Sequence, residues 1–310
     1  MKNFLSTLLS LLNNMDLTKE NKVGVGGYGL PADFQCITPS FLSSIEDLSY
    51  EERISTIYHY ITGNDLPKNA FSNLNNAEFP ASVASIDQGL SALELNDGEN
   101  ANYTDYIVNG DCCMEIVSFA CVIISAYVDL VSGGIISSGE KINLAFNGED
   151  GRLILSAYFL KLLKLPIEVL LIGTEKPIDG LYRGLYIQSP MEGEINTLVS
   201  GLYEDIDYLI DPLSAYGLVS YDLYYGDYED DRVTLLLALT SPYLYARQVL
   251  KYAFDINEIS VDKAVSKLNA LTAVDIPSGI LNKKLQPFFK INSQLSAKSA
   301  LEIIKGCNKV

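Results

Sequence analysis

The segment between residues 142 and 173 constrains the fold more than any other part of the sequence. Residues 142–146 and 167–172 are short, mostly apolar runs, the pattern of strands buried on both faces. Between them, residues 151–165 read as a strongly apolar helix, which Pro166 terminates. A strand, a helix and a second strand in this order form a βαβ unit with parallel strands. We therefore predict an α/β fold, a mostly parallel sheet covered by helices on both faces.

The loop after the first of these strands is acidic. Parallel sheets bind ligands at the carboxyl ends of their strands, and this loop carries Glu149 and Asp150 directly before the helix begins at Gly151. Two carboxylates at a helix start satisfy its unpaired N–H groups and repel a phosphate dianion. A self-capped helix is therefore the favoured interpretation. The alternative is a phosphate site that uses Gly148 and Gly151, with Arg152 beside them.

The rest of the chain extends this pattern on both sides. A helix is predicted from about residue 49 to residue 62, with Gly63 at its end. Further predicted elements are a strand at 89–95, a buried helix at 114–131, a helix near 215–224, a strand at 233–239 and a helix from 242 to about 254. We divide the chain into a small N-terminal helical domain, residues 1–80, and an α/β domain, residues 81–310.

Charge and cysteine content exclude several classes of function. The formal net charge of −17 opposes binding to nucleic acid and to anionic membranes, because both require attraction to phosphate. No apolar run approaches the ~20 residues that a membrane span needs. The five cysteines include the neighbours Cys112 and Cys113, and this usage indicates reduced thiols and a cytoplasmic location. Basic residues are absent from 69–140 and 184–231, whereas the segment after Arg247 is rich in lysine.

Several short motifs follow one another along the chain. They are Gly26-Gly27-Tyr28-Gly29-Leu30-Pro31, Leu48-Ser49-Tyr50-Glu51-Glu52, Gly63-Asn64-Asp65-Leu66-Pro67, Lys164-Leu165-Pro166-Ile167, Asp211-Pro212-Leu213-Ser214-Ala215-Tyr216-Gly217 and Ser241-Pro242-Tyr243-Leu244-Tyr245. In type and order they resemble motifs of the threonine synthase family, pyridoxal-phosphate (PLP) enzymes of fold type II. The resemblance covers most of the chain. It implies the large α/β lobe of that fold together with an N-terminal helical domain.

Two departures from the family imply that this chain lacks PLP catalysis. The family holds the cofactor phosphate with a glycine-rich loop, and a degenerate form stands here, Glu149, Asp150, Gly151 and Arg152. The family's Schiff-base lysine, aligned without gaps, corresponds to Thr104, and no lysine occurs between Lys68 and Lys141. A long middle block of the family, including much of its mobile lobe, is missing, so the chain resembles a truncated member. We expect no cofactor and assign no catalytic residue.

Other chemistry finds little support in the sequence. His59 is the only histidine and lies in a predicted helix, where a structural role is favoured. One histidine and no spaced cysteine pairs exclude the common zinc patterns, and we predict no metal site. The acidic turn with Asp227, Glu229, Asp230 and Asp231 is interpreted as solvated.

The leading hypothesis is a threonine-synthase-like protein that acts in binding or interaction. One alternative is an enzyme with PLP-independent chemistry in the remaining cleft, where Asn147, Asp211 and Ser214 are candidate ligand-binding residues. Another is a partner subunit of a full-length synthase. A small-molecule ligand, a homo-oligomer or a protein partner fits these hypotheses, whereas nucleic acid and membranes do not.

Overall fold

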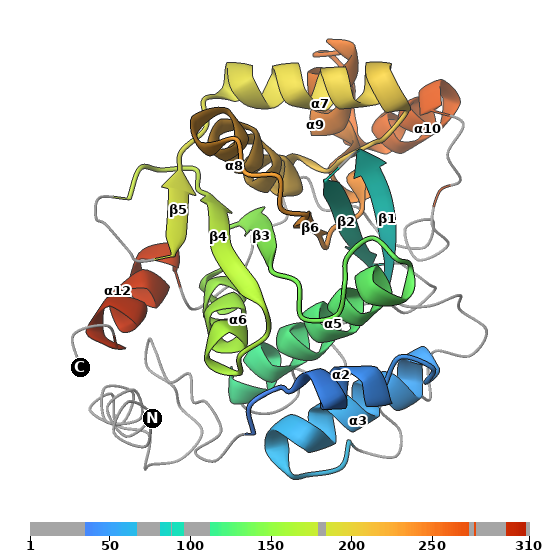
Figure 1. Ribbon diagram of the computed structural model, residues 1–310. Coiled ribbons are helices and arrows are strands. Elements are labelled where there is room, and N and C mark those ends of the chain that lie inside the picture. Colours follow the sequence, from blue (N-terminus) through green and yellow to red (C-terminus); the bar gives the residue numbers. More distant parts are fainter. Residues whose placement is uncertain are drawn as a thin grey trace, which may run out of the picture.

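The computed structural model describes residues 35–66, 81–87, 89–95, 112–178, 184–272, 276 and 296–307 of the 310-residue chain. Within this part, one sheet of six strands has the order β1-β2-β6-β3-β4-β5 (Figure 1). The strands are β1 (Ala81–Asp87), β2 (Leu90–Leu95), β3 (Ile142–Asn147), β4 (Ile167–Gly173), β5 (Leu185–Gln188) and β6 (Thr234–Ala238). Only the edge strand β1 is antiparallel to its neighbour, and the other pairings are parallel. The predicted α/β class is confirmed.

Helices cover both faces of the sheet. One layer consists of α2 (Pro39–Ser44), α3 (Tyr50–Thr62), α5 (Cys112–Ser132), α6 (Gly151–Leu162) and α12 (Ala297–Cys307). The other consists of α7 (Glu192–Ile206), α8 (Pro212–Tyr228), the short 3-10 helix η1 (Pro242–Tyr245), α9 (Ala246–Phe254) and α10 (Val261–Thr272). Figure 1 shows these two layers below and above the strands. Successive residues of β3 alternate between them, because Leu144 and Phe146 join the first core cluster and Ala145 joins the second.

The predicted βαβ unit is present. β3 and β4 run parallel with Ile142 opposite Ile167 and Asn147 opposite Gly173, and α6 connects them. The helix ends at Leu162, three residues before the predicted end at 165. The reason is a turn in which Lys164 takes a left-handed conformation, φ 69°, and the Leu165 N–H bonds back to the Leu160 carbonyl. Pro166 therefore follows the helix end instead of creating it.

The predicted N-terminal helix is confirmed as α3, and its caps explain its bounds. The Ser49 hydroxyl accepts the N–H of Glu52 while the Glu52 carboxylate accepts the N–H of Ser49, a capping box. At the other end Gly63 adopts φ 72°, which closes the helix at low steric cost. Both α2 and α3 pack in the same hydrophobic cluster as α5 and α6. The division of the chain at residue 80 stays a prediction.

Arg53 ties this N-terminal pair of helices to α5. Its guanidinium is buried and donates to the carbonyl oxygen of Ile45, to Ser125 and to Asp129. The helix α5 is the longest in the described residues and is mostly buried, as the sequence predicts for residues 114–131. No helix in the described part of the chain is long and apolar enough to cross a membrane.

The remaining predicted elements are found with small shifts in their ends. The strand predicted at 89–95 is β2, and the one predicted at 233–239 is β6. The helix predicted near 215–224 is α8, which extends further at both ends, and the last predicted helix is divided into η1 and α9. The sequence patterns did not indicate α7, α10, α12 or β5. The strand β5 has only four residues, all partly exposed, so it lacks the apolar run of a buried strand.

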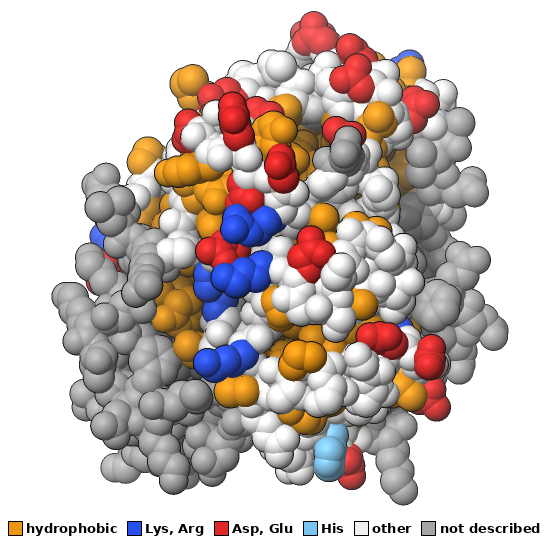
Figure 2. All heavy atoms as spheres, in the orientation of Figure 1, with side chains coloured by type: hydrophobic (Ala, Val, Ile, Leu, Met, Phe, Trp, Pro, Cys, Tyr) orange, Lys and Arg blue, Asp and Glu red, His pale blue; other side chains and the backbone are white. Residues whose placement is uncertain are grey.

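Charge is unevenly spread over the surface. Figure 2 shows acidic side chains scattered over the top of the molecule, where α7 lies, and basic side chains gathered in one strip lower on the same face. The helices α7 and α8 contain no Lys or Arg. At the amino ends of the strands, Lys141 pairs with Glu168 at 2.6 Å, and Lys161 and Arg232 lie close enough to help lower the pKa of that carboxylate, which Lys141 lowers most.

Candidate functional site

The carboxyl ends of β3 and β6 are the place where a sheet of this kind binds ligands. The strand β3 ends at Asn147 and leads through Gly148, Glu149 and Asp150 into α6. Asp211 stands directly before α8, and Ser214 on that helix reaches the end of β6, since its hydroxyl lies 3.5 Å from the Leu237 carbonyl oxygen. Two helix starts therefore lie at this edge, one on each face of the sheet.

The loop before α6 uses its own N–H groups. The N–H of Gly148 donates to the Gly173 carbonyl at 2.8 Å, and that of Glu149 donates to the Asn147 side chain at 2.8 Å. The N–H of Arg152 donates to the Asp150 carboxylate at 3.0 Å, and the N–H of Leu153 donates to the Asp150 carbonyl. A phosphate held at a helix start needs such donors free and directed at it. With these four donors engaged and the Asp150 carboxylate at the helix start, the loop is poorly suited to the phosphate of PLP.

The side chains of the loop place negative charge at the start of α6. Asp150 caps α6, as the sequence predicts, and its carboxylate also pairs with the Arg152 guanidinium at 2.5 Å. Both side chains are only 15% exposed, so this arginine is compensated by the cap. Glu149 does not cap the helix, contrary to expectation. Its carboxylate accepts the N–H of Glu175 at 2.7 Å and so joins this loop to the one after β4.

Glycines at this edge serve close packing. A Cβ added at Gly148 would lie 2.5 Å from the Ile172 side chain, and one added at Gly173 would lie 2.1 Å from the Tyr216 carbonyl oxygen. The contact at Gly173 is with backbone atoms and excludes a side chain unless the backbone moves, whereas at Gly148 the Ile172 side chain would have to move. The glycine at 148 therefore lets β3 and β4 approach each other, and the sequence signal that favoured a phosphate site there has a packing explanation.

The start of α8 is more deeply buried. Asp211 is 1% exposed, and one of its carboxylate oxygens accepts the N–H groups of Leu213 at 2.9 Å and Ser214 at 3.1 Å. The other oxygen is buried and has no hydrogen-bond partner in the described part of the chain. Burial raises the pKa of Asp211 to about 6. Nearby, Tyr208 donates to Glu94 at 2.5 Å, and burial together with that carboxylate raises the pKa of Tyr208.

The structure brings only some of the predicted site residues together. Asp211 and Ser214 share the first turn of α8, whereas the Asn147 side chain is engaged within its own loop. The helices α6 and α8 pack in different core clusters, on opposite faces of the sheet. In the described residues, no hydrogen bond joins the Asn147 side chain to Asp211 or Ser214. Thr104 lies outside the described residues.

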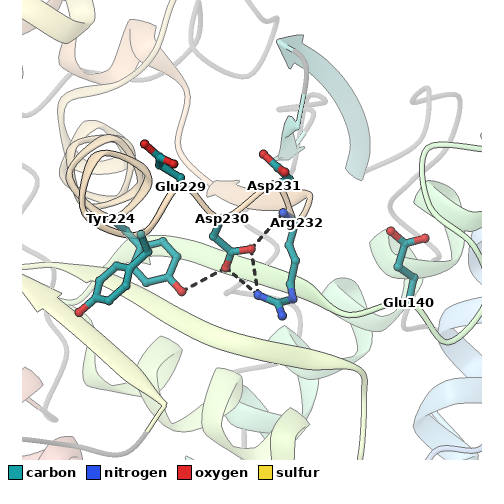
Figure 3. A pocket seen from close by; sticks show the side chains of 7 residues that line it. Glu140, Tyr224, Glu229, Asp230, Asp231 and Arg232 are labelled. Carbon is teal, nitrogen blue, oxygen red and sulfur yellow. Dashed lines mark hydrogen bonds and ion pairs between the residues drawn. The ribbon is translucent and has the colours of Figure 1, made fainter.

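A depression of about 590 Å³ lies at the opposite edge of the sheet, beside the amino ends of β3 and β6. Its lining consists of Glu140, Tyr224, Tyr228, Glu229, Asp230, Asp231 and Arg232 (Figure 3). The sequence pattern led us to interpret the acidic part of this lining as a solvated turn. The signal that could have indicated a site is the helical spacing of Tyr221, Tyr224, Tyr225 and Tyr228. No cluster suited to a metal ion occurs in the described residues.

No model of a protein family matches this chain, and no curated protein does either. Solved structures do match. Threonine synthase from Escherichia coli superposes with a TM-score of 0.58 at 12% identity, covering 99% of this chain and 97% of that one. Threonine synthase from yeast gives 0.60 at 12%, covering 99% and 96%. PLP-bound threonine synthase from Brucella melitensis gives 0.52 at 11%, covering 86% and 91%.

This chain has the threonine synthase fold. The resemblance seen in the sequence motifs is thereby confirmed at the level of the fold. At 11–12% identity, the similarity to threonine synthases shows the fold of this chain but not its activity. The predicted truncation, the loss of the Schiff-base lysine and the loss of catalysis stay predictions.

Proposed function

We propose that this protein uses the threonine synthase fold for binding or interaction, without PLP catalysis. The observation that carries the proposal is the loop before α6. The N–H groups of Gly148, Glu149 and Arg152 bond to Gly173, Asn147 and Asp150 respectively, and the Asp150 carboxylate lies where a phosphate would approach the helix. To bind a phosphate there, the protein would have to break these bonds and remove a carboxylate from the positive end of the helix dipole.

The electrostatics of the surrounding edge support the same conclusion. Tyr216 lies on α8 near this loop, and its pKa is raised by burial and further by Tyr252, Glu175 and Glu149. The neighbourhood is therefore rich in negative charge. A phosphate dianion would be repelled by it, and the net charge of −17 adds to that repulsion. Arg152 offers little compensation because it already pairs with Asp150.

The sequence adds a second, independent argument. PLP enzymes anchor the cofactor to a lysine through a Schiff base. In the threonine synthase alignment that position corresponds to Thr104, and the whole stretch from 69 to 140 lacks lysine. Lys176 lies in the loop after β4 and is the first described lysine that follows the carboxyl end of that strand. Its side chain is exposed.

The test is a titration of the purified protein with PLP. A bound aldehyde gives a visible aldimine band, which borohydride reduction traps on the lysine that formed it. We expect no saturable band of one PLP per chain, and mass spectrometry should find only sparse labelling spread over several exposed lysines. A stoichiometric band trapped on one lysine would refute the proposal.

Two variants sharpen this test. In Lys176→Ala the lysine beside the β4 end is lost, so sparse labelling elsewhere should be unchanged. If the wild type gave a strong band that this variant lacked, Lys176 would be the anchor and the proposal would fail. Lys263→Ala is the matched control, because Lys263 is an exposed lysine on α10, away from the carboxyl edge of β3 and β4.

A further inference from the structure

The depression at the amino edge of the strands has an aromatic wall. Tyr224 and Tyr228, one turn apart on α8, have ring centroids 4.7 Å apart. Tyr186 on β5 meets both edge-on, with centroids 5.1 Å from Tyr224 and 6.0 Å from Tyr228. Three mutually packed rings hold each other in place, which reduces the entropy lost when a ligand contacts them. Tyr228 remains 62% exposed, so much of its ring is available to a ligand.

The hydroxyl groups of two of these tyrosines donate to carboxylates. The Tyr224 hydroxyl donates to Asp230 at 3.1 Å, and the Tyr186 hydroxyl donates to Asp227 at 2.7 Å. Asp230 also pairs with Arg232 at 2.9 Å. Figure 3 shows the contacts of Asp230 with Tyr224 and with Arg232 in the pocket lining. The single basic residue of the lining is thus compensated. The ring faces remain as the part of the tyrosines that a ligand can contact.

Three carboxylates of the lining, those of Glu140, Glu229 and Asp231, pair with no basic side chain in the described part of the chain. All three residues are exposed, and the Glu140 carboxylate accepts the N–H of Ser137 at 2.8 Å. Glu229 and Asp231 follow α8, whose carboxyl end adds negative potential. The nearby Lys141 does not supply compensation, because it pairs with Glu168. The pocket therefore combines aromatic faces with free negative charge, the combination that recognises an organic cation.

We propose that this tyrosine–carboxylate pocket binds an arginine side chain of a basic peptide segment. A guanidinium is planar and stacks on an aromatic ring while its N–H groups donate to carboxylates. The depression, at about 590 Å³, exceeds one side chain, which fits a peptide segment and not a lone ion. The site lies at the edge of the sheet opposite the loop before α6, so this proposal is independent of the proposed loss of PLP catalysis.

Fluorescence anisotropy with a short fluorescein-labelled oligo-arginine peptide tests the proposal near physiological salt. We expect saturable binding, and binding several-fold weaker for the matched oligo-lysine peptide, since lysine stacks less well on a ring. Tyr228→Leu should weaken oligo-arginine binding about fivefold through loss of the cation–π contact. The double variant Glu229→Gln/Asp231→Asn should weaken it by a similar or larger factor. Circular dichroism checks that each variant is folded.

The matched controls lie on the same helix, outside the pocket lining. Tyr225→Leu removes a tyrosine that is 47% exposed, and Asp222→Asn removes an exposed carboxylate. Both should leave binding within about twofold. Equal binding of the two peptides, or equal losses in pocket and control variants, would indicate general attraction to an acidic protein and overturn the proposal. So would no binding, or a concentration-dependent dimer that the double variant abolishes, which would assign the pocket to a second copy of the chain.

Discussion

Replacing Asp211 by asparagine tests the electrostatics of the carboxyl edge directly. The Asp211 carboxylate is almost fully buried, and only one of its oxygens is hydrogen bonded, to the N–H groups at the start of α8. Burial raises its pKa from 3.8 to about 6. Asparagine retains an oxygen that can cap the helix but carries no charge. The variant Asp211→Asn therefore removes the buried charge while it keeps the cap.

The sign and size of the effect follow from the two pKa values. Since the folded-state pKa is raised, protonated Asp211 stabilises the fold, and this contribution is complete below the unfolded-state value and lost as pH rises through about 6. The difference between the folded-state and unfolded-state pKa values of Asp211 corresponds to about 3 kcal/mol at most, because each tenfold change in proton affinity is worth about 1.4 kcal/mol. The free energy of unfolding of the variant, relative to wild type, should rise by up to about 3 kcal/mol from about pH 4 to about pH 7.5.

Urea unfolding followed by circular dichroism at a series of pH values measures this difference. The pH dependence of the difference is the quantity of interest, because any constant cost of the asparagine NH₂ group cancels. Asp230→Asn is the control of opposite sign. Although burial acts to raise the pKa of Asp230, hydrogen bonds from Arg232, Asn143 and Tyr224 lower it, so this variant should lose stability relative to wild type as pH rises through the acid range. A flat or falling curve for Asp211→Asn would refute the reasoning.

Two further predictions concern packing and burial. Gly173→Ala places a Cβ 2.1 Å from the Tyr216 carbonyl oxygen and should lower the free energy of unfolding by more than about 3 kcal/mol, a severe case of overpacking. The control Gly226→Ala lies inside α8 with open space around it and should raise the free energy of unfolding by about 0.5 to 1 kcal/mol. Urea unfolding compares the two variants, and a Gly173→Ala protein of wild-type stability would contradict the contact. Arg53→Ala removes the hydrogen bonds that the buried guanidinium donates to Ile45, Ser125 and Asp129. It should cost about 1.5 to 3 kcal/mol, since hydrogen bonds of a charged group are lost while Asp129 keeps access to solvent. Thermal unfolding measures this cost, and an unchanged Tm would show that Arg53 contributes nothing.

Much of the local structure could be predicted from the sequence because its causes are local. The capping box at Ser49, the glycine end at Gly63 and the cap at Asp150 each depend on residues within one helical turn. The apolar runs of β3, β4 and β6 also indicate burial without reference to the rest of the chain. The strand β5 was not indicated, because its four residues are all half-exposed and form no apolar run. The helix α7 was missed although the sequence carries a signal for it, since Ile195, Leu198, Val199 and Leu202 recur at helical spacing.

The sequence by itself determined the α/β class, the βαβ unit and the acidic cap of α6, since neighbouring residues specify strands, helices and their ends. Only the tertiary structure decided that β6 lies between β2 and β3, because strand order depends on contacts between distant segments. It also decided that α6 and α8 pack on opposite faces of the sheet, because the face that a helix covers depends on contacts with strands that are distant in sequence. The pocket at the amino edge has the same origin. Glu140 is distant in sequence from Tyr224 and Asp230, and the parallel pairing of β3 with β6 brings them to one edge.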